Sequence, residues 1–204
     1  MWQKLVEQIQ SRGISFDHGL SDTETSTAEQ RFGFRFPPDL RAFLQTAAPR
    51  GRYFPDWRSD DIATINDWLD RPREGIVFDI EHNGVWLEEW GSRPDTLSEA
   101  ITIVNRLVLS APKLIPIYQH RMMPSEPHLP GNPVFSVHQT DIIVYGSNLR
   151  DYLAHEFLMT EEEQDDWTVP SDTRRIEFWD TDRFQEVRWE NGSCVFDNSR
   201  GQLP

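Results

Sequence analysis

The chain has 204 residues, with 20 basic and 34 acidic side chains and a formal net charge of −14. This length suits one domain that buries about 70% of its unfolded surface. The acidic balance argues against nucleic acid as a partner, because phosphate binding needs clustered Lys and Arg. No apolar run approaches the ~18 residues of a membrane span, and the lone Cys194 cannot form an internal disulfide, which fits a reducing cytoplasm.

Periodic apolar residues and capping signals predict six helices. Ser21 and Glu24 have the spacing of a capping box at the start of the second helix. The fourth is expected to begin at Asp60 or Asp61 and to end at Pro72, because proline cannot continue the helical hydrogen-bond ladder. The predicted helices cover residues 2–12, 21–32, 38–44, 60–71, 97–111 and 149–157.

Runs of β-branched and aromatic residues predict strands, most of them joined by short turns. They lie at residues 76–80, 85–90, 114–118, 134–137, 142–145 and 174–179, with a weak hairpin within 184–196. Asn83-Gly84 is the strongest turn signal, since both turn positions need positive φ. Together these elements predict an α+β fold with a central, mostly antiparallel sheet flanked by helices. We expect one domain over residues 1–180 and a C-terminal extension over residues 181–204.

The sequence carries no strong signature of a catalytic, metal or cofactor site. Its six histidines lack the spacing of a helical zinc site, and one cysteine cannot build a thiolate site. Gly146-Ser147-Asn148 lacks the spacing of a nucleophile elbow. Arg50, Arg52 and Arg58 lie among aromatic residues, but Asp56 weakens that basic patch. We therefore expect no cofactor, no metal and no enzymatic activity.

The aromatic segment at residues 85–90 is the most unusual feature. On a strand, Trp86, Glu88 and Trp90 would point to one face of the sheet. Two interpretations stay open: the tryptophans cover the core, or they anchor a protein partner within a charged rim. Arg121 is a further candidate, with Asp141 as its expected ion-pair partner. The candidate partner-binding residues are Trp86, Glu88, Glu89, Trp90, Asp60, Asp61, Arg121 and Asp141.

Several segments, taken in order, resemble the SUKH superfamily and more narrowly the Smi/Knr family of cell-wall synthesis regulators and their bacterial relatives. The resemblance covers about residues 20–180 and is most specific at residues 76–94 and 114–157. The segments are ETSTAEQRFGFRFPPDLRAFL, GIVFDIEHNGVWLEEWGSRP, PKLIPIYQHRMMPSEP, GNPVFSVHQTDIIVYGSNLRDYLAHEF and RRIEFW.

This resemblance implies an α+β scaffold that binds proteins and has no catalytic residues. Bacterial relatives of this type are largely immunity proteins that neutralise a toxin domain, so we expect a toxin as the partner. The net charge favours a basic toxin, such as a nuclease whose active site binds phosphate. Two alternatives remain: a regulatory module in cell-wall or signalling assemblies, and a small-molecule hydrolase. The hydrolase would need a concave pocket with convergent polar groups of perturbed pKa.

Overall fold

The computed structural model describes residues 2–179, 184, 187–190 and 193–196. The helices are α1 Trp2–Ser11, α2 Asp22–Phe32, α3 Pro38–Thr46, α4 Ile62–His82, α5 Leu97–Ser110, α6 Leu149–Phe157 and α7 Glu161–Asp165, with a 3-10 turn η1 at Glu88–Trp90. The strands are β1 Ser15–His18, β2 Ala47–Arg50, β3 Leu114–Tyr118, β4 Arg121–Pro124, β5 Val134–His138, β6 Asp141–Gly146, β7 Val187–Glu190 and β8 Ser193–Phe196.

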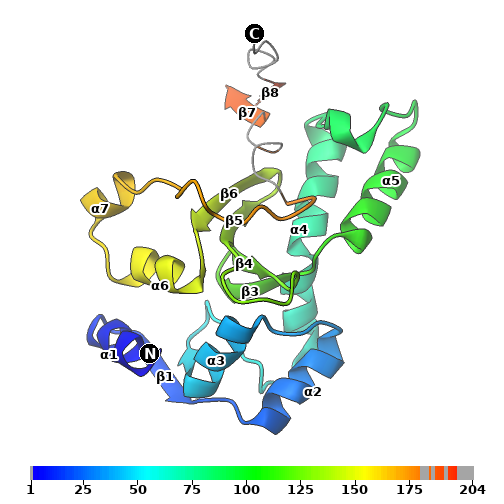
Figure 1. Ribbon diagram of the computed structural model, residues 1–204. Coiled ribbons are helices and arrows are strands. Elements are labelled where there is room, and N and C mark those ends of the chain that lie inside the picture. The colour runs from blue at the N-terminus through cyan, green and yellow to red at the C-terminus, as the bar shows by residue number, and fades with distance from the viewer. Residues whose placement is uncertain (1, 180–183, 185–186, 191–192, 197–204) are drawn as a thin grey trace.

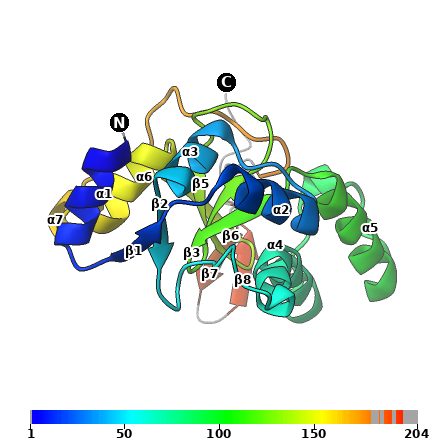
Figure 2. The same ribbon diagram turned by 90° about the horizontal axis from the view of Figure 1, so that it is seen from below.

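The predicted α+β fold is confirmed: a four-stranded antiparallel sheet of order β3-β4-β5-β6 lies among the helices (Figure 1). Successive residues of a strand face opposite sides of a sheet. Ile115 and Met123 are paired across β3 and β4, and they belong to a buried cluster with α1, α2, α3 and α6. Met122 and Phe135 face the other side, where they pack with α4 and α5. The sheet is therefore covered by helices on both faces (Figure 2).

Local capping chemistry sets several helix ends where the sequence predicts them. Ser21 and Glu24 form a reciprocal capping box at the start of α2, which satisfies backbone N–H groups that have no helical partner. Gly33 follows α2 at φ 67°, a left-handed conformation that glycine adopts without steric cost. Asn148 accepts a hydrogen bond from the Asp151 N–H and begins α6.

The sequence prediction differs most from the structure at helix α4. The expected break at Pro72 and the expected strand at residues 76–80 are both wrong, because α4 runs unbroken through them. Ile76 and Ile80 are buried while Phe78 is 43% exposed, a spacing that a helix produces and an alternating strand does not. Asn83-Gly84 ends the helix instead of turning a hairpin, and Gly84 has a φ of 68°.

Other boundaries differ from the predicted ones as well. Residues 174–179 form no strand, although Ile176 and Trp179 are buried in the α4–α5 side of the core. Strand β4 and the β1–β2 pair were not predicted. Helix α7 was not predicted; it is made of acidic residues and glutamine and begins with a capping box at Thr160. Strands β7 and β8 pair as an antiparallel hairpin within residues 184–196.

Candidate protein-binding surface on the α4–α5 hairpin

The α4–α5 hairpin is the pair of helices α4 and α5 with the connection between them. Its distal part projects from the body of the molecule (Figure 1). The fully buried carboxylate of Asp79 fixes α4 to the β5–β6 turn, since Oδ2 accepts the Thr140 N–H at 2.8 Å and the Thr140 hydroxyl at 2.5 Å. Gly75 lets these backbones meet: a Cβ there would lie 2.7 Å from the Gln139 Cα. The hairpin therefore has a rigid base.

Trp86 and Trp90 lie in the connection between the two helices. Their rings meet edge to face with centroids 5.5 Å apart, and the Trp86 Nε1–H donates to the Gly91 carbonyl at 2.7 Å. Both rings are half-buried against the core cluster that contains Val85 and Leu87. Because η1 replaces the expected strand, the alternation of residues 86–90 across a sheet is wrong. The packing of both rings on the core agrees with the first interpretation, and the second, an anchor for a protein partner, stays a prediction.

Helix α5, which follows the connection, has an unusually apolar surface. Eight of the fourteen residues of α5 are apolar, yet only Ala100 and Val104 are buried. Leu97 is 46% exposed and Leu109 82% exposed. A single exposed leucine is common on soluble proteins, but several apolar side chains on one element indicate an interaction surface.

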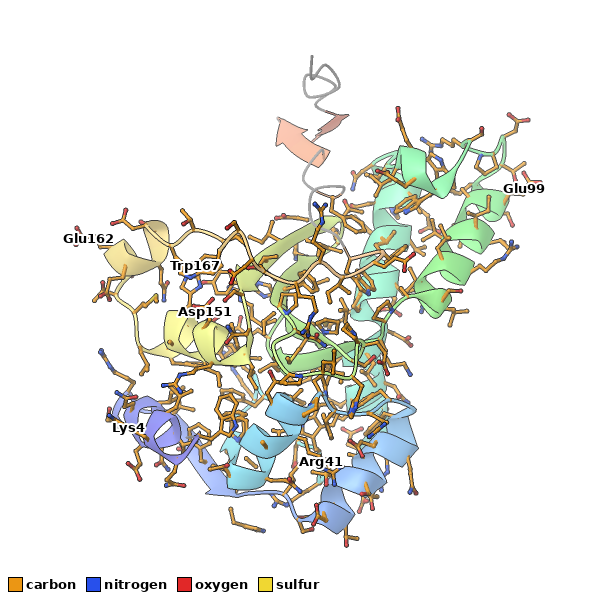
Figure 3. The ribbon with its side chains drawn as sticks, in the orientation of Figure 1. Lys4, Arg41, Glu99, Asp151, Glu162 and Trp167 are labelled. Atoms are coloured by element: carbon orange, nitrogen blue, oxygen red, sulfur yellow. The ribbon has the colours of Figure 1, made fainter. Side chains whose placement is uncertain are left out.

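The same part of the chain carries exposed carboxylates. Over residues 80–110 the exposed charged side chains are Glu81, Glu88, Glu89, Asp95, Glu99, Arg93 and Arg106. Five are acidic and two are basic, so the local charge has the sign of the whole chain. Figure 3 shows Glu99 at the outer end of α5, pointing away from the body. The arrangement can attract a positively charged macromolecule and offer it apolar contacts.

Asp60 and Asp61 do not join this surface. Asp61 caps the N-terminus of α4 by accepting the Thr64 N–H at 3.2 Å, and Asp60 lies 3.7 Å from Arg31. A helix of 21 residues is about 30 Å long. The two aspartates and the two tryptophans therefore lie at opposite ends of α4, and the predicted site residues do not form one site.

Arg121 is engaged inside the fold. Its Nε donates to Glu156 Oε2 at 3.1 Å, and its Nη1 donates to the Ser136 hydroxyl at 2.7 Å and contacts the His120 ring. Its guanidinium carbon lies 3.6 Å from the centroid of the Tyr145 ring. The Arg121 side chain is only 12% exposed and that of Glu156 18%. Arg121 therefore joins β4 to α6.

Asp141 faces the same side of the sheet as Arg121, but strand β5 lies between their strands. Asp141 is exposed opposite His138, so the expected ion pair of Arg121 with Asp141 is wrong.

Burial is the main reason that the pKa of His120 is lowered to about 4, with Arg121 and His138 adding charge repulsion. The His120 imidazole is therefore neutral near pH 7 and accepts from Arg121.

A stacked column continues from Arg121 and was not predicted. The centroid of the Tyr145 ring lies 4.4 Å from that of the His155 ring, which lies 4.9 Å from that of the Trp167 ring. His155 is buried, and its Nδ1 is 2.8 Å from the Tyr145 carbonyl oxygen. The sequence offers no signal for this column, because its members come from β4, β6, α6 and the segment after α7.

Comparisons with known proteins add no relative: no family model, no curated protein and no solved structure matches the chain. Within the described part of the chain, no three His, Cys, Asp or Glu side chains come together in a group that could hold a metal ion. None of the described helices combines the length and the apolar character needed to cross a membrane.

Proposed function

We propose that the chain is a protein-binding domain that recognises a basic protein through the α4–α5 hairpin. The observation that carries this proposal is the half-buried Trp86–Trp90 pair next to the incompletely buried α5, in a part of the chain, residues 80–110, that carries five exposed carboxylates. Tryptophan is enriched among the residues that dominate interface energies, and charged residues at the rim steer encounter.

The resemblance of the sequence to the SUKH superfamily supports a more specific form of this proposal. In that form, the domain is a cytoplasmic immunity protein, and its partner is a toxin with a positively charged active site, such as a nuclease. A regulatory module without a toxin would use the same surface. A toxin gene next to the gene for this chain would favour immunity, and its absence would favour regulation.

Photo-cross-linking tests the location of the binding surface. We would replace Leu97, which is exposed on α5, with p-benzoylphenylalanine, and use Leu129, which is exposed on the loop between β4 and β5, as the matched control position. Cells of the source organism are then irradiated and the adducts identified. We expect a basic protein to be captured from position 97 and not from position 129.

Charge reversal provides the second arm of this experiment. When the chain also carries Glu88→Lys and Glu89→Lys, we expect the yield of the adduct at position 97 to fall at least about tenfold, because like charges at an interface disfavour association. Capture from position 129 alone, or capture from position 97 that is unchanged by the charge reversal, would contradict the proposal.

A further inference from the structure

A second surface, far from the distal end of the α4–α5 hairpin, contains a cavity of about 330 Å³. It opens between the β1–β2 pair and residues 51–58. Its floor consists of side chains that are buried and apolar: Leu20, Leu44, Phe54 and Trp57. Ligand pockets begin at about 300 Å³, so this cavity has room for one large side chain.

The walls of this cavity are held in place by Arg58. Its Nε donates to Glu24 Oε1 at 2.6 Å, and its Nη2 donates to the carbonyl oxygens of His18 at 3.0 Å and Gly19 at 2.9 Å. The hydrogen bond from Arg58 is the largest of the causes that lower the pKa of Glu24 to about 2. Residues 51–58 are thereby fixed to the start of α2, and the cavity is preformed.

The rim of the cavity carries two acidic and two basic side chains: Asp17, Asp56, Arg50 and Arg58. Asp17 and Asp56 line it and are exposed. Arg50 pairs with Asp17 at 3.3 Å, and Arg58 is occupied by Glu24. Among these four side chains Asp56 alone has no ion-pair partner within the residues that the structure describes, so a cationic ligand would be attracted by Asp56 and by the net charge of −14 of the chain.

We propose that this cavity is a docking site for an extended segment of a partner protein in which a large apolar residue is flanked by Lys or Arg. The apolar side chain fills the space above Leu44 and Trp57, where removal from water contributes most of the binding energy. The flanking cation lies at the rim beside Asp56. This site is independent of the α4–α5 hairpin, so it stands whether or not that hairpin binds a basic protein.

Peptide titration tests the proposal on the full chain. The probe is the blocked tripeptide acetyl-Lys-Phe-Arg-amide, with acetyl-Lys-Ser-Arg-amide and acetyl-Glu-Phe-Glu-amide as matched controls. Binding is followed by the ¹⁵N–¹H signals of the Trp57 indole and the Gly51 amide. We expect saturable shifts with the probe and an affinity at least about fivefold higher than with either control, since each control removes one of the two contributions. Equal affinity for the serine peptide or the glutamate peptide, or no shift at Trp57, would overturn the proposal.

Two variants locate the peptide in the cavity. Asp56→Asn retains an oxygen that can accept the Arg58 N–H, a bond of 3.0 Å in the native chain, but removes the charge. We expect this variant to bind the probe with about three- to tenfold lower affinity than the native chain. Ala48→Phe, on the half-buried wall, fills the cavity and should abolish the shifts. Asp141→Asn on β6 is the matched control and should bind as the native chain does. Native affinity in both Asp56→Asn and a folded Ala48→Phe would refute the assignment.

Discussion

Replacing Arg121 with alanine is expected to lower the free energy of unfolding by about 2–4 kcal/mol, because it breaks from one side an ion pair that is largely shielded from water. The substitution leaves the Glu156 carboxylate with little solvent and no cation, and it also removes the donor to Ser136 and the stacking on Tyr145. Urea unfolding followed by far-ultraviolet circular dichroism measures the loss.

Two matched variants separate the ion pair from a general loss of packing. Asp141→Asn lies on the same sheet face but is exposed, so it should change stability by less than about 0.5 kcal/mol. The double variant Arg121→Met/Glu156→Leu leaves no buried charge and should recover most of the loss. If Arg121→Ala cost no more than Asp141→Asn, the structural role assigned to Arg121 would be wrong.

Asp79→Ala is expected to destabilise the chain by a similar amount, about 3–5 kcal/mol, because buried donors lose their acceptor. Besides the two hydrogen bonds from Thr140, the Asp79 Oδ1 accepts the Asn83 side-chain amide at 2.7 Å. The substitution therefore weakens both the attachment of α4 to the β5–β6 turn and the end of α4. The measurement is again the urea midpoint and slope.

Asp70→Ala is the control for Asp79→Ala, since Asp70 lies on the same helix but is exposed, with an Arg73 nitrogen at 3.8 Å. We expect it to cost less than about 0.5 kcal/mol. Asp79→Asn keeps one acceptor oxygen and should lie between the two. Equal stability of Asp79→Ala and Asp70→Ala would show that the buried carboxylate is not what fixes α4.

The parts of the fold that sequence reasoning predicts are those set by local chemistry. The capping box of Ser21 and Glu24 and the cap at Asn148 depend on residues three positions apart, so their spacing is visible in the sequence. The strands β3, β5 and β6 are likewise apolar runs bounded by turn residues. Antiparallel pairing follows from the short links between them.

The failure at residues 72–90 has an identifiable physical cause. Asn83-Gly84 supplies a positive φ at Gly84, and both a hairpin turn and a helix C-terminus use that conformation. Pro72 is tolerated within α4, where it is buried. Tertiary contacts decide between the two outcomes: Asp79, one residue before Ile80, reaches a hydrogen-bond partner 61 positions away at Thr140.

The candidate sites were predictable only in part. The two tryptophans and the acids between them are neighbours in the sequence, so the sequence alone suggests them as a candidate protein-binding surface. The strand geometry predicted for them is wrong. The partner of Arg121 is 35 positions away on α6, and no local pattern identifies Glu156. The cavity floor brings Leu20, Leu44 and Trp57 together through the β1–β2 pair, which the sequence did not predict.

The affinity of the basic protein captured at position 97, measured by calorimetry at 50 and 300 mM salt, tests the central claim most directly. The account predicts that binding by the native chain weakens at least about tenfold between these salt concentrations, and that Glu88→Lys/Glu89→Lys reduces this salt dependence. It predicts that Trp90→Ala costs about 2 kcal/mol of binding energy, roughly 30-fold in affinity, with the salt dependence unchanged. Equal affinities of the native chain, Glu88→Lys/Glu89→Lys and Trp90→Ala at both salt concentrations would contradict the proposal that the α4–α5 hairpin binds a basic protein.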